Sequence, residues 1–254
     1  MNQDRAQELR ELLNSPLVGF EDVGEEALAR YDQALTHSSF ASEEQQRGIE
    51  TGDYEQLEFL GDCILDFIIA EELFSSFRLR ARSLHDRFPD KTDESLLTDM
   101  LHDITNDRKL AEIVVANRIF DPCIRRGSGQ ELNDSIRAGA LEAFIAAVYY
   151  HKGFNGAQQL VQRLFRQRIE HAEPITSWKN KLQECVQKKF QPPDVRTILQ
   201  YHEPVPENGS TAVSVQVSVN GIPWGVGRAG CKRDAEIAAA KNAYETHCRN
   251  TGGH

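Results

Sequence analysis

The sequence lacks an uninterrupted apolar stretch of about 18 residues, so no transmembrane helix is expected. Its first residues are charged and lack the apolar centre of a secretory signal, which predicts a cytoplasmic protein with no membrane partner. The five cysteines show no CxxC pairing and are interpreted as reduced thiols. The P-loop and GxSxG motifs are also missing, so the sequence gives no support for P-loop nucleotide chemistry or for acyl transfer of that type.

The negative charge is unevenly distributed along the chain. The net charge is −10, a value that taken alone argues against a nucleic-acid partner. From Glu173 onward, however, 10 Lys and Arg stand against 8 Asp and Glu, whereas the residues before it have 19 against 31. The acidic excess therefore lies wholly in the first two thirds, and the mean charge hides two unlike parts.

Residues 1–171 have the texture of an almost entirely helical domain. Short polar or proline-containing links separate its periodic segments. Residues 172–177, "AEPITS", break the pattern and form the best candidate linker. Helical periodicity covers residues 25–36, 54–77, 95–105, 109–116, 135–151 and 157–171.

Residues 178–254 have a different texture, which predicts a small α+β domain of order α-β-β-β-α. Asn220-Gly221 is a strong hairpin turn between two β-rich segments. The predicted helices are 178–190 and 232–247, and the predicted strands are 195–201, 212–219 and a third beginning at "IPWGVG".

Three acids stand at the front of the apolar run "GDYEQLEFLGDCILDFIIAEELF". Glu55, Glu58 and Asp62 are spaced i, i+3, i+7, which places them on one side of a helix. A solvated helix face would explain a single acid pair. Gly61, however, costs up to about 1 kcal/mol relative to alanine inside a helix and indicates close approach of a backbone or ligand. Because no Lys or Arg offsets the clustered charge, the alternative is a site for a hard cation such as Mg²⁺.

Three motifs carry a resemblance to the ribonuclease III family, and together with the following domain it covers residues 25–248. "YEQLEFLGDCIL" resembles the family's "NERLEFLGDAVL", and "ALTHSSFA" ahead of it resembles "ALTHRSYA". "SIRAGALEAFIAAVYYHKG" is similar to the later "SILADALEALIGAIYLDGG". The α-β-β-β-α module resembles the double-stranded RNA-binding domain of bacterial-type enzymes. The resemblance implies a catalytic domain at 1–171, a linker at 172–177 and an RNA-binding domain at 178–254.

The resemblance also implies a mechanism. Carboxylates from two motifs hold Mg²⁺, with Mn²⁺ as a substitute, and the ion activates water to cut one strand of an RNA duplex. Two such sites in a homodimer make staggered cuts that leave 5′-phosphate and 3′-hydroxyl ends, as in the processing of ribosomal and messenger RNA precursors. By position, Glu58 and Asp62 match metal ligands of the first motif, Glu142 matches the glutamate of the second, and Glu55 matches a supporting glutamate near the scissile backbone.

One ligand position departs from the family pattern. Gly139 stands where the family has aspartate, three residues before Glu142. Asp134 lies off the face of Glu142, so it is not expected to substitute. Weaker metal affinity and reduced activity are expected, with water filling the place of the missing oxygen.

The basic residues of the catalytic domain are also arranged differently from the family. After "FPDKT", where the family has a basic stretch, Asp99 and Asp103 stand instead. Residues 78–87, "RLRARSLHDR", are interpreted as an insertion, either a solvated loop or a phosphate-contacting loop that replaces the lost charge. His37 is interpreted as a structural histidine at a helix end.

In the second domain the resemblance assigns RNA contacts to both helices. Lys232 and Arg233 open the last helix, where free N–H groups and basic side chains would hold phosphates. Gln183 and Glu184 of the first helix match residues that read 2′-hydroxyls in the minor groove. The first hairpin lacks the family's "GPxH" loop and carries Glu203 and Glu207, which predicts weakened, salt-sensitive binding. Trp224 is interpreted as a sheet-packing residue.

Two functions of different class follow. The first is a Mg²⁺-dependent endoribonuclease specific for double-stranded RNA. The second is a catalytically impaired homologue that binds or scaffolds double-stranded RNA, which Gly139 favours. The retention of Glu55, Glu58, Asp62 and Glu142 favours the enzyme.

Overall fold

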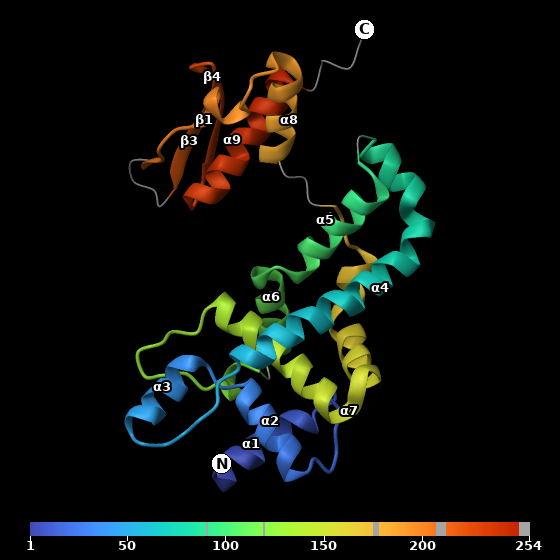
Figure 1. Ribbon diagram of the computed structural model, residues 1–254, viewed down its shortest axis with the longest axis vertical. Coiled ribbons are helices and arrows are strands. Elements are labelled where there is room, and N and C mark those ends of the chain that lie inside the picture. Colours follow the sequence, from blue (N-terminus) through green and yellow to red (C-terminus); the bar gives the residue numbers. More distant parts are fainter. Residues whose placement is uncertain (90, 119, 175–177, 207–211, 249–254) are drawn as a thin grey trace. The chain divides into compact units, whose positions relative to one another are not determined.

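The chain forms two compact units, Met1–Ile175 and Thr176–His254. The first is helical and the second combines helices with an antiparallel sheet, which confirms the predicted fold class (Figure 1). Of the expected linker 172–177, residues 175–177 lie outside the described residues. The computed structural model describes residues 1–89, 91–118, 120–174, 178–206 and 212–248.

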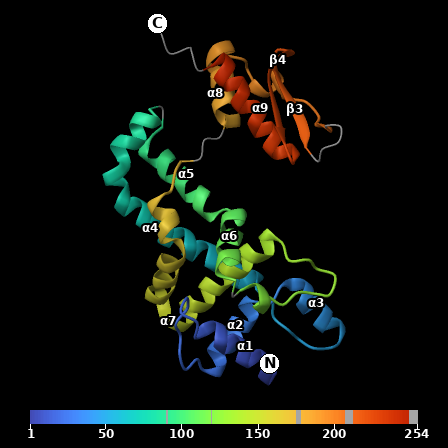
Figure 2. The same cartoon turned by 180° about the vertical axis from the view of Figure 1, so that it is seen from behind.

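The first unit is built around two long helices that lie side by side, α4 and α7 (Figures 1 and 2). Helix α5 packs on α4, while α2 and α6 pack on α7. The elements of this unit are α1 (Gln3–Leu13), α2 (Glu25–Ala34), α3 (Ser38–Gln46), α4 (Glu55–Arg87), α5 (Asp93–Thr105), α6 (Asp107–Asn117), η1 (Asp121–Cys123) and α7 (Asp134–Glu170).

Helix α7 owes its close packing to small residues. Alanine is frequent in its first half, and a run of side chains from Ala143 to Val148 is buried. The helix is interrupted at Gly153, whose φ of 69° and ψ of −175° are not helical. Because glycine adopts positive φ without steric cost, this break divides α7 close to where the sequence predicted two helices, 135–151 and 157–171.

Helix α4 is longer than predicted. The periodicity predicted an end at Phe77 followed by an inserted loop at 78–87, but the helix continues to Arg87, so that prediction is wrong. The reason is that Phe77 and Leu84 are both buried, and their i, i+7 spacing continues the apolar stripe of the helix.

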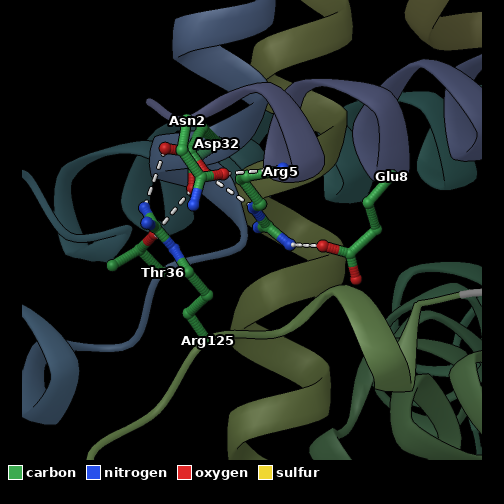
Figure 3. Close-up of polar contacts among 6 residues, drawn as sticks. All are labelled: Asn2, Arg5, Glu8, Asp32, Thr36 and Arg125. Atoms are coloured by element: carbon green, nitrogen blue, oxygen red, sulfur yellow. Dashed lines mark hydrogen bonds and ion pairs between the residues drawn. The ribbon is translucent and has the colours of Figure 1, made fainter.

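The first helix, α1, has no counterpart among the predicted segments, yet it belongs to the core. Leu9, Leu12 and Leu13 are buried in the same hydrophobic cluster as α4 and α7. A polar junction fixes α1 to α2: Asp32 accepts hydrogen bonds from Arg5 Nε and from Arg125 Nη2, each at 2.8 Å (Figure 3). Two guanidinium groups from distant segments thus share one carboxylate.

The second unit packs two helices against an antiparallel sheet. The central strand β3 pairs with β4 on one edge and with β1 and β2 on the other. The predicted helices match α8 and α9 at both ends. The single strand predicted at 195–201 is instead a 3₁₀ turn at 195–197 and a short strand at 199–201. The elements are α8 (Trp178–Phe190), η2 (Val195–Thr197), β1 (Leu199–Tyr201), β2 (Val205–Pro206), β3 (Val213–Val219), β4 (Ile222–Ala229) and α9 (Lys232–His247).

Two features of this sheet follow directly from the sequence. Asn220 and Gly221 both have positive φ, 51° and 75°, and form the predicted tight turn between β3 and β4. Trp224 stacks on His247 with ring centroids 4.5 Å apart and packs against the core of the unit. The interpretation of this tryptophan as a packing residue is confirmed.

The prediction of five reduced thiols is wrong for two of them. Cys185 of α8 and Cys248, which follows α9, form a disulfide with their Cα atoms 6.2 Å apart. The two residues are 63 apart in sequence, and they meet because α8 packs against α9. Of the other thiols, Cys63 and Cys231 are exposed and Cys123 is buried.

The structure also bears on two simpler expectations. Within the described ranges, no helix combines the length and the apolar character that crossing a membrane requires. His37 caps α3, where its Nδ1 accepts a hydrogen bond from the Ser39 amide at 3.1 Å. Its interpretation as a structural histidine at a helix end is confirmed.

Candidate functional site

The candidate active site lies where α4 and α7 touch. A Cβ atom added to Gly61 would lie 1.8 Å from the backbone oxygen of Glu142, so only glycine permits this approach. The expectation that Gly61 marks close approach of another backbone is thereby confirmed. Since Asp62 follows Gly61 directly, the contact brings acids of the two helices together.

Glu142 is the electrostatic centre of this cluster. Its pKa is raised from 4.5 to about 8, first by burial and then by the charges of Asp62, Glu58, Asp107 and Asp66, in that order. Burial disfavours the ionised form, and like charges nearby add to that effect. Every neighbour that shifts this pKa is itself an acid, so Glu142 lies in a strongly negative field.

The two acids of α4 share that field, but Glu55 lies at its edge. The pKa of Glu58 is raised by burial first and then by Glu55, Asp107 and Asp62. Glu55 is exposed and is absent from the groups that shift Glu142. The structure thus places Glu58, Asp62 and Glu142 in one electrostatic environment, with Glu55 at its edge and next to Glu58.

The donor set fits a hard divalent cation in its chemistry. Within the described part of the chain, the carboxylates of Glu58, Asp62 and Glu142 have neither a hydrogen bond nor an ion pair. Carboxylate oxygens without a basic partner are what Mg²⁺ or Mn²⁺ takes as ligands. As the side chains stand, no group of three or more described His, Cys, Asp or Glu residues is close enough to hold a metal ion. An ion would have to draw the mutually repelling acids together.

The position of the missing aspartate faces the cluster. Gly139 is buried one turn before Glu142, and the nearest atoms to a Cβ built there belong to the Glu58 carboxylate. Asp134 is exposed and lies 3.7 Å from Arg137 in an ion pair. Asp134 is not among the acids that shift the pKa of Glu142, and its pairing with Arg137 agrees with the expectation that it does not substitute for the missing ligand.

Sequence reasoning missed two acids of the cluster. Asp107 is the first residue of α6, where an acid after the Asn106 cap is typical of any helix start and therefore gave no signal. Asp66 follows Asp62 by one turn on α4, a spacing that was open to inspection. Its pKa is raised by burial first, and the charge of Asp62 adds to that effect.

The basic segment 78–87, interpreted as either a solvated loop or a phosphate-contacting loop, is the end of helix α4 and not a loop. Arg87 donates to both oxygens of Glu173 at 2.7 and 3.1 Å, and Arg80 donates to the backbone oxygen of Ala172. These two arginines fasten the end of α4 to the chain that follows α7. In the structure these two arginines therefore make polar contacts within the first unit.

In the second unit, the residues predicted to hold phosphates open α9. Lys232 and Arg233 are exposed, and the N-cap residue Cys231 makes no side-chain capping bond. The Nζ of Lys232 lies 3.1 Å from an oxygen of Glu203, a residue of the first hairpin. Glu207, the second acid of that hairpin, lies outside the described residues. The acid expected to weaken RNA binding thus pairs directly with a candidate phosphate ligand.

The residues predicted to read the minor groove lie on α8. Gln183 and Glu184 are both exposed, whereas Leu182 and Val186 on the opposite face are buried. Cys185 follows directly and ties this helix to the end of α9 through the disulfide. The two polar side chains are therefore presented to solvent on a helix whose position is fixed.

Comparison with known proteins agrees with this division. A family model described as Ribonuclease-III-like matches residues 28–169, and a Double-stranded RNA binding motif matches residues 178–247. A Ribonuclease 3 from Clostridium tetani (strain Massachusetts / E88) is 30% identical, covering 94% of this chain and 94% of that protein. One from Chlamydia trachomatis serovar D is 33% identical, covering 84% and 87%. The solved nuclease domain of ribonuclease III from Campylobacter jejuni is 26% identical with a TM-score of 0.46, covering 63% of this chain and 93% of that one.

A helical domain with a carboxylate cluster, followed by a double-stranded RNA binding motif, defines an endoribonuclease of double-stranded RNA. The chain belongs to the ribonuclease III family. This confirms the resemblance drawn from the motifs around Asp62 and Glu142. Enzymes of this family depend on divalent metal, in agreement with the chemistry of the donor set.

Proposed function

We propose that this protein cuts double-stranded RNA with Mg²⁺ held by Glu58, Asp62 and Glu142, and that Mn²⁺ substitutes for Mg²⁺. The observation that carries the proposal is the close approach of Gly61 to the backbone oxygen of Glu142, which brings acids of α4 beside Glu142, and the raised pKa of Glu142 agrees with it. Within the described residues no basic side chain pairs with these carboxylates, so a divalent cation would be needed to offset their charge.

The candidate site residues have distinct parts in this reaction. The chemistry supplied by the bound cation is activation of water for attack on a phosphodiester and stabilisation of the leaving oxygen. Glu58, Asp62 and Glu142 provide the negative oxygens that hold it, and Glu142 must release its proton to do so. Glu55, exposed beside Glu58, lies at the edge where the RNA backbone would approach. Lys232 and Arg233 would hold phosphates, and Gln183 and Glu184 would contact 2′-hydroxyls.

We infer that the protein acts as a homodimer. The exposed side of α4 carries Phe59, Phe67 and Phe74, which are 74%, 59% and 71% exposed. Their spacing of 8 and 7 residues keeps them on one face, and a row of exposed aromatic side chains on one helix is typical of a surface that a partner covers. The nuclease domain of Campylobacter jejuni ribonuclease III is described as having a region involved in dimer formation. A dimer would bring two carboxylate sites to one duplex.

Gly139 favours a second function, binding or scaffolding of double-stranded RNA without cleavage. The chain lacks one carboxylate that the family supplies, and its double-stranded RNA binding motif does not depend on that residue. Processing of ribosomal or messenger RNA precursors and a cytoplasmic location remain predictions under either function.

The test is cleavage of a long RNA duplex by the full chain with Mg²⁺, with Mn²⁺ and with a chelator. We expect cleavage with either ion, none with the chelator, and none for Glu142→Ala with either ion. Glu170→Ala is the matched control, because Glu170 is an exposed acid near the end of the same helix. Binding of the duplex without cleavage by the parent at high Mg²⁺, together with cleavage by Gly139→Asp, would establish the second function instead.

A further inference from the structure

The carboxylate of Glu58 lies in the space that a side chain at Gly139 would occupy. A Cβ at Gly139 would lie 2.8 Å from Glu58 Oε1, 2.9 Å from Cδ and 3.1 Å from Oε2. The first two distances are too short for a Cβ contact and the third is tighter than most such contacts, so the carboxylate of Glu58 lies over the bare glycine. The aspartate that the family has at this position would begin with that same Cβ atom.

We propose that the Glu58 carboxylate takes the place left by the missing aspartate, and that Gly139 is the residue that makes room for it. This inference rests on the proposed function, because it concerns the same cation site. A place that the family fills from α7 is then filled by a carboxylate of α4, and the ligands are still Glu58, Asp62 and Glu142. Gly139 is part of a rearranged site and not simply a lost ligand.

The surroundings of Gly139 exclude the simpler explanation that the backbone needs a glycine there. At Gly61 a Cβ would strike the backbone of Glu142, whereas the nearest atoms at Gly139 are all at the far end of the Glu58 side chain. Gly139 has no positive φ, so its backbone conformation does not require glycine. Alanine is also the better helix former. The side chain of Glu58 is thus the feature that singles out glycine.

The arrangement of the acids agrees with the proposal. Gly139 and Glu142 are three residues apart on one face of α7, so a carboxylate over Gly139 lies beside Glu142. Glu58 and Asp62 are four residues apart on α4. Because Glu58 has no hydrogen bond or ion pair within the described residues, its carboxylate is available to a cation at this position.

The proposal makes Gly139→Ala informative, because this change removes no ligand. The Cβ would displace the flexible end of Glu58 while leaving the backbone in place, so the fold should be retained. The measurement is binding of Mn²⁺ alone to the full chain, followed by electron paramagnetic resonance, with circular dichroism to confirm folding. We expect a loss of affinity of about tenfold or more.

A double-mutant cycle separates this effect from a general disturbance of α7. In Glu58→Gln the ligand is already gone, so adding Gly139→Ala should change Mn²⁺ affinity little further. In Glu58→Ala, adding Gly139→Asp should restore Mn²⁺ affinity, because the aspartate then fits into the space that the Glu58 carboxylate has left. With Glu58 intact, Gly139→Asp should give no gain, because the two carboxylates compete for one space.

Two results would overturn the inference while leaving the proposed function intact. One is that the parent cuts the duplex and binds Mn²⁺, and that Gly139→Ala binds Mn²⁺ with the same affinity as the parent. The other is an equal loss from Gly139→Ala with and without the Glu58 carboxylate. A parent that neither binds Mn²⁺ nor cuts a duplex would overturn both.

Discussion

The backbone oxygen of Glu142 faces the α-carbon of Gly61 so closely that no side chain fits between α4 and α7 at this point. This contact holds the two acidic faces of the site together. We expect Gly61→Ala to destabilise the first unit by at least about 2 kcal/mol, because backbone cannot yield as a side chain does. Chemical unfolding followed by circular dichroism measures the effect. Gly129→Ala is the control, since nothing lies within 4 Å of a Cβ there; equal stability of the two variants would contradict the close approach.

The stability of the metal-free protein should depend on Glu142. Its pKa is 4.5 ordinarily and about 8 in the folded protein, so the folded state holds the proton more tightly than the unfolded chain. The resulting stabilisation is complete below the lower pKa and is lost as pH rises through the higher one. In Glu142→Gln this loss should be absent, so the difference in thermal midpoint between parent and variant should change between about pH 5 and pH 8.

The same comparison isolates this carboxyl group from other titrating groups. Glu170→Gln, an exposed acid on the same helix, should follow the parent at every pH. A constant difference between parent and Glu142→Gln across this interval would argue that Glu142 titrates as an ordinary exposed glutamate.

Reduction of the disulfide should destabilise the second unit. Cys185 and Cys248 close a loop over 63 residues, for which the chain-entropy estimate is about 4 kcal/mol. Both tryptophans of the chain, Trp178 and Trp224, lie in this unit, so their fluorescence reports on its unfolding alone. Cys185→Ser should unfold at lower denaturant than the parent, and the parent with reductant should match it. Cys231→Ser should behave as the parent, because this thiol is free.

The ion pair between Glu203 and Lys232 should restrain RNA binding. A phosphate that approaches Lys232 must replace the Glu203 carboxylate, which lies 3.1 Å from the lysine nitrogen. We expect Glu203→Gln to bind a long duplex several-fold more tightly at low salt, with the gain shrinking as salt rises. The measurement is filter binding in a chelator, which prevents cleavage.

The matched control for that experiment removes the same charge elsewhere on the unit. Glu245→Gln changes an exposed acid near the other end of α9. If both variants gained affinity equally, the effect would be one of net charge, and the pairing with Lys232 would have no part in it.

The elements that bear the candidate site were predictable because their signals are local. The apolar stripe and the acids of α4 repeat at helical spacing, so Glu58 and Asp62 were placed on one face from the sequence alone. The end of α8 was predictable from the Pro-Pro pair after Phe190. The start of α9 was predictable from the short hairpin before Lys232. Assignment of these residues to metal and RNA remains a prediction.

What the sequence did not reveal depends on contacts between distant segments. Asp107 joins the field of Glu142 only because α6 packs against α7. Cys185 and Cys248 meet across 63 residues with no motif to announce them. The continuation of α4 beyond Phe77 is decided by the burial of Leu84, which a run of arginines concealed. In the first two cases the deciding partner lies far away in the sequence, whereas Leu84 is only seven residues from Phe77 and its signal was local.

The junction at Asp32 has a practical consequence for where this domain starts. A chain trimmed to residue 25 would keep every recognisable motif and the whole segment matched by the family model, 28–169. It would also lose the leucines of α1 from the interior and leave the Asp32 carboxylate with Arg125 alone. Truncation guided by motifs would therefore yield a damaged nuclease, so preparations of the isolated domain should retain α1.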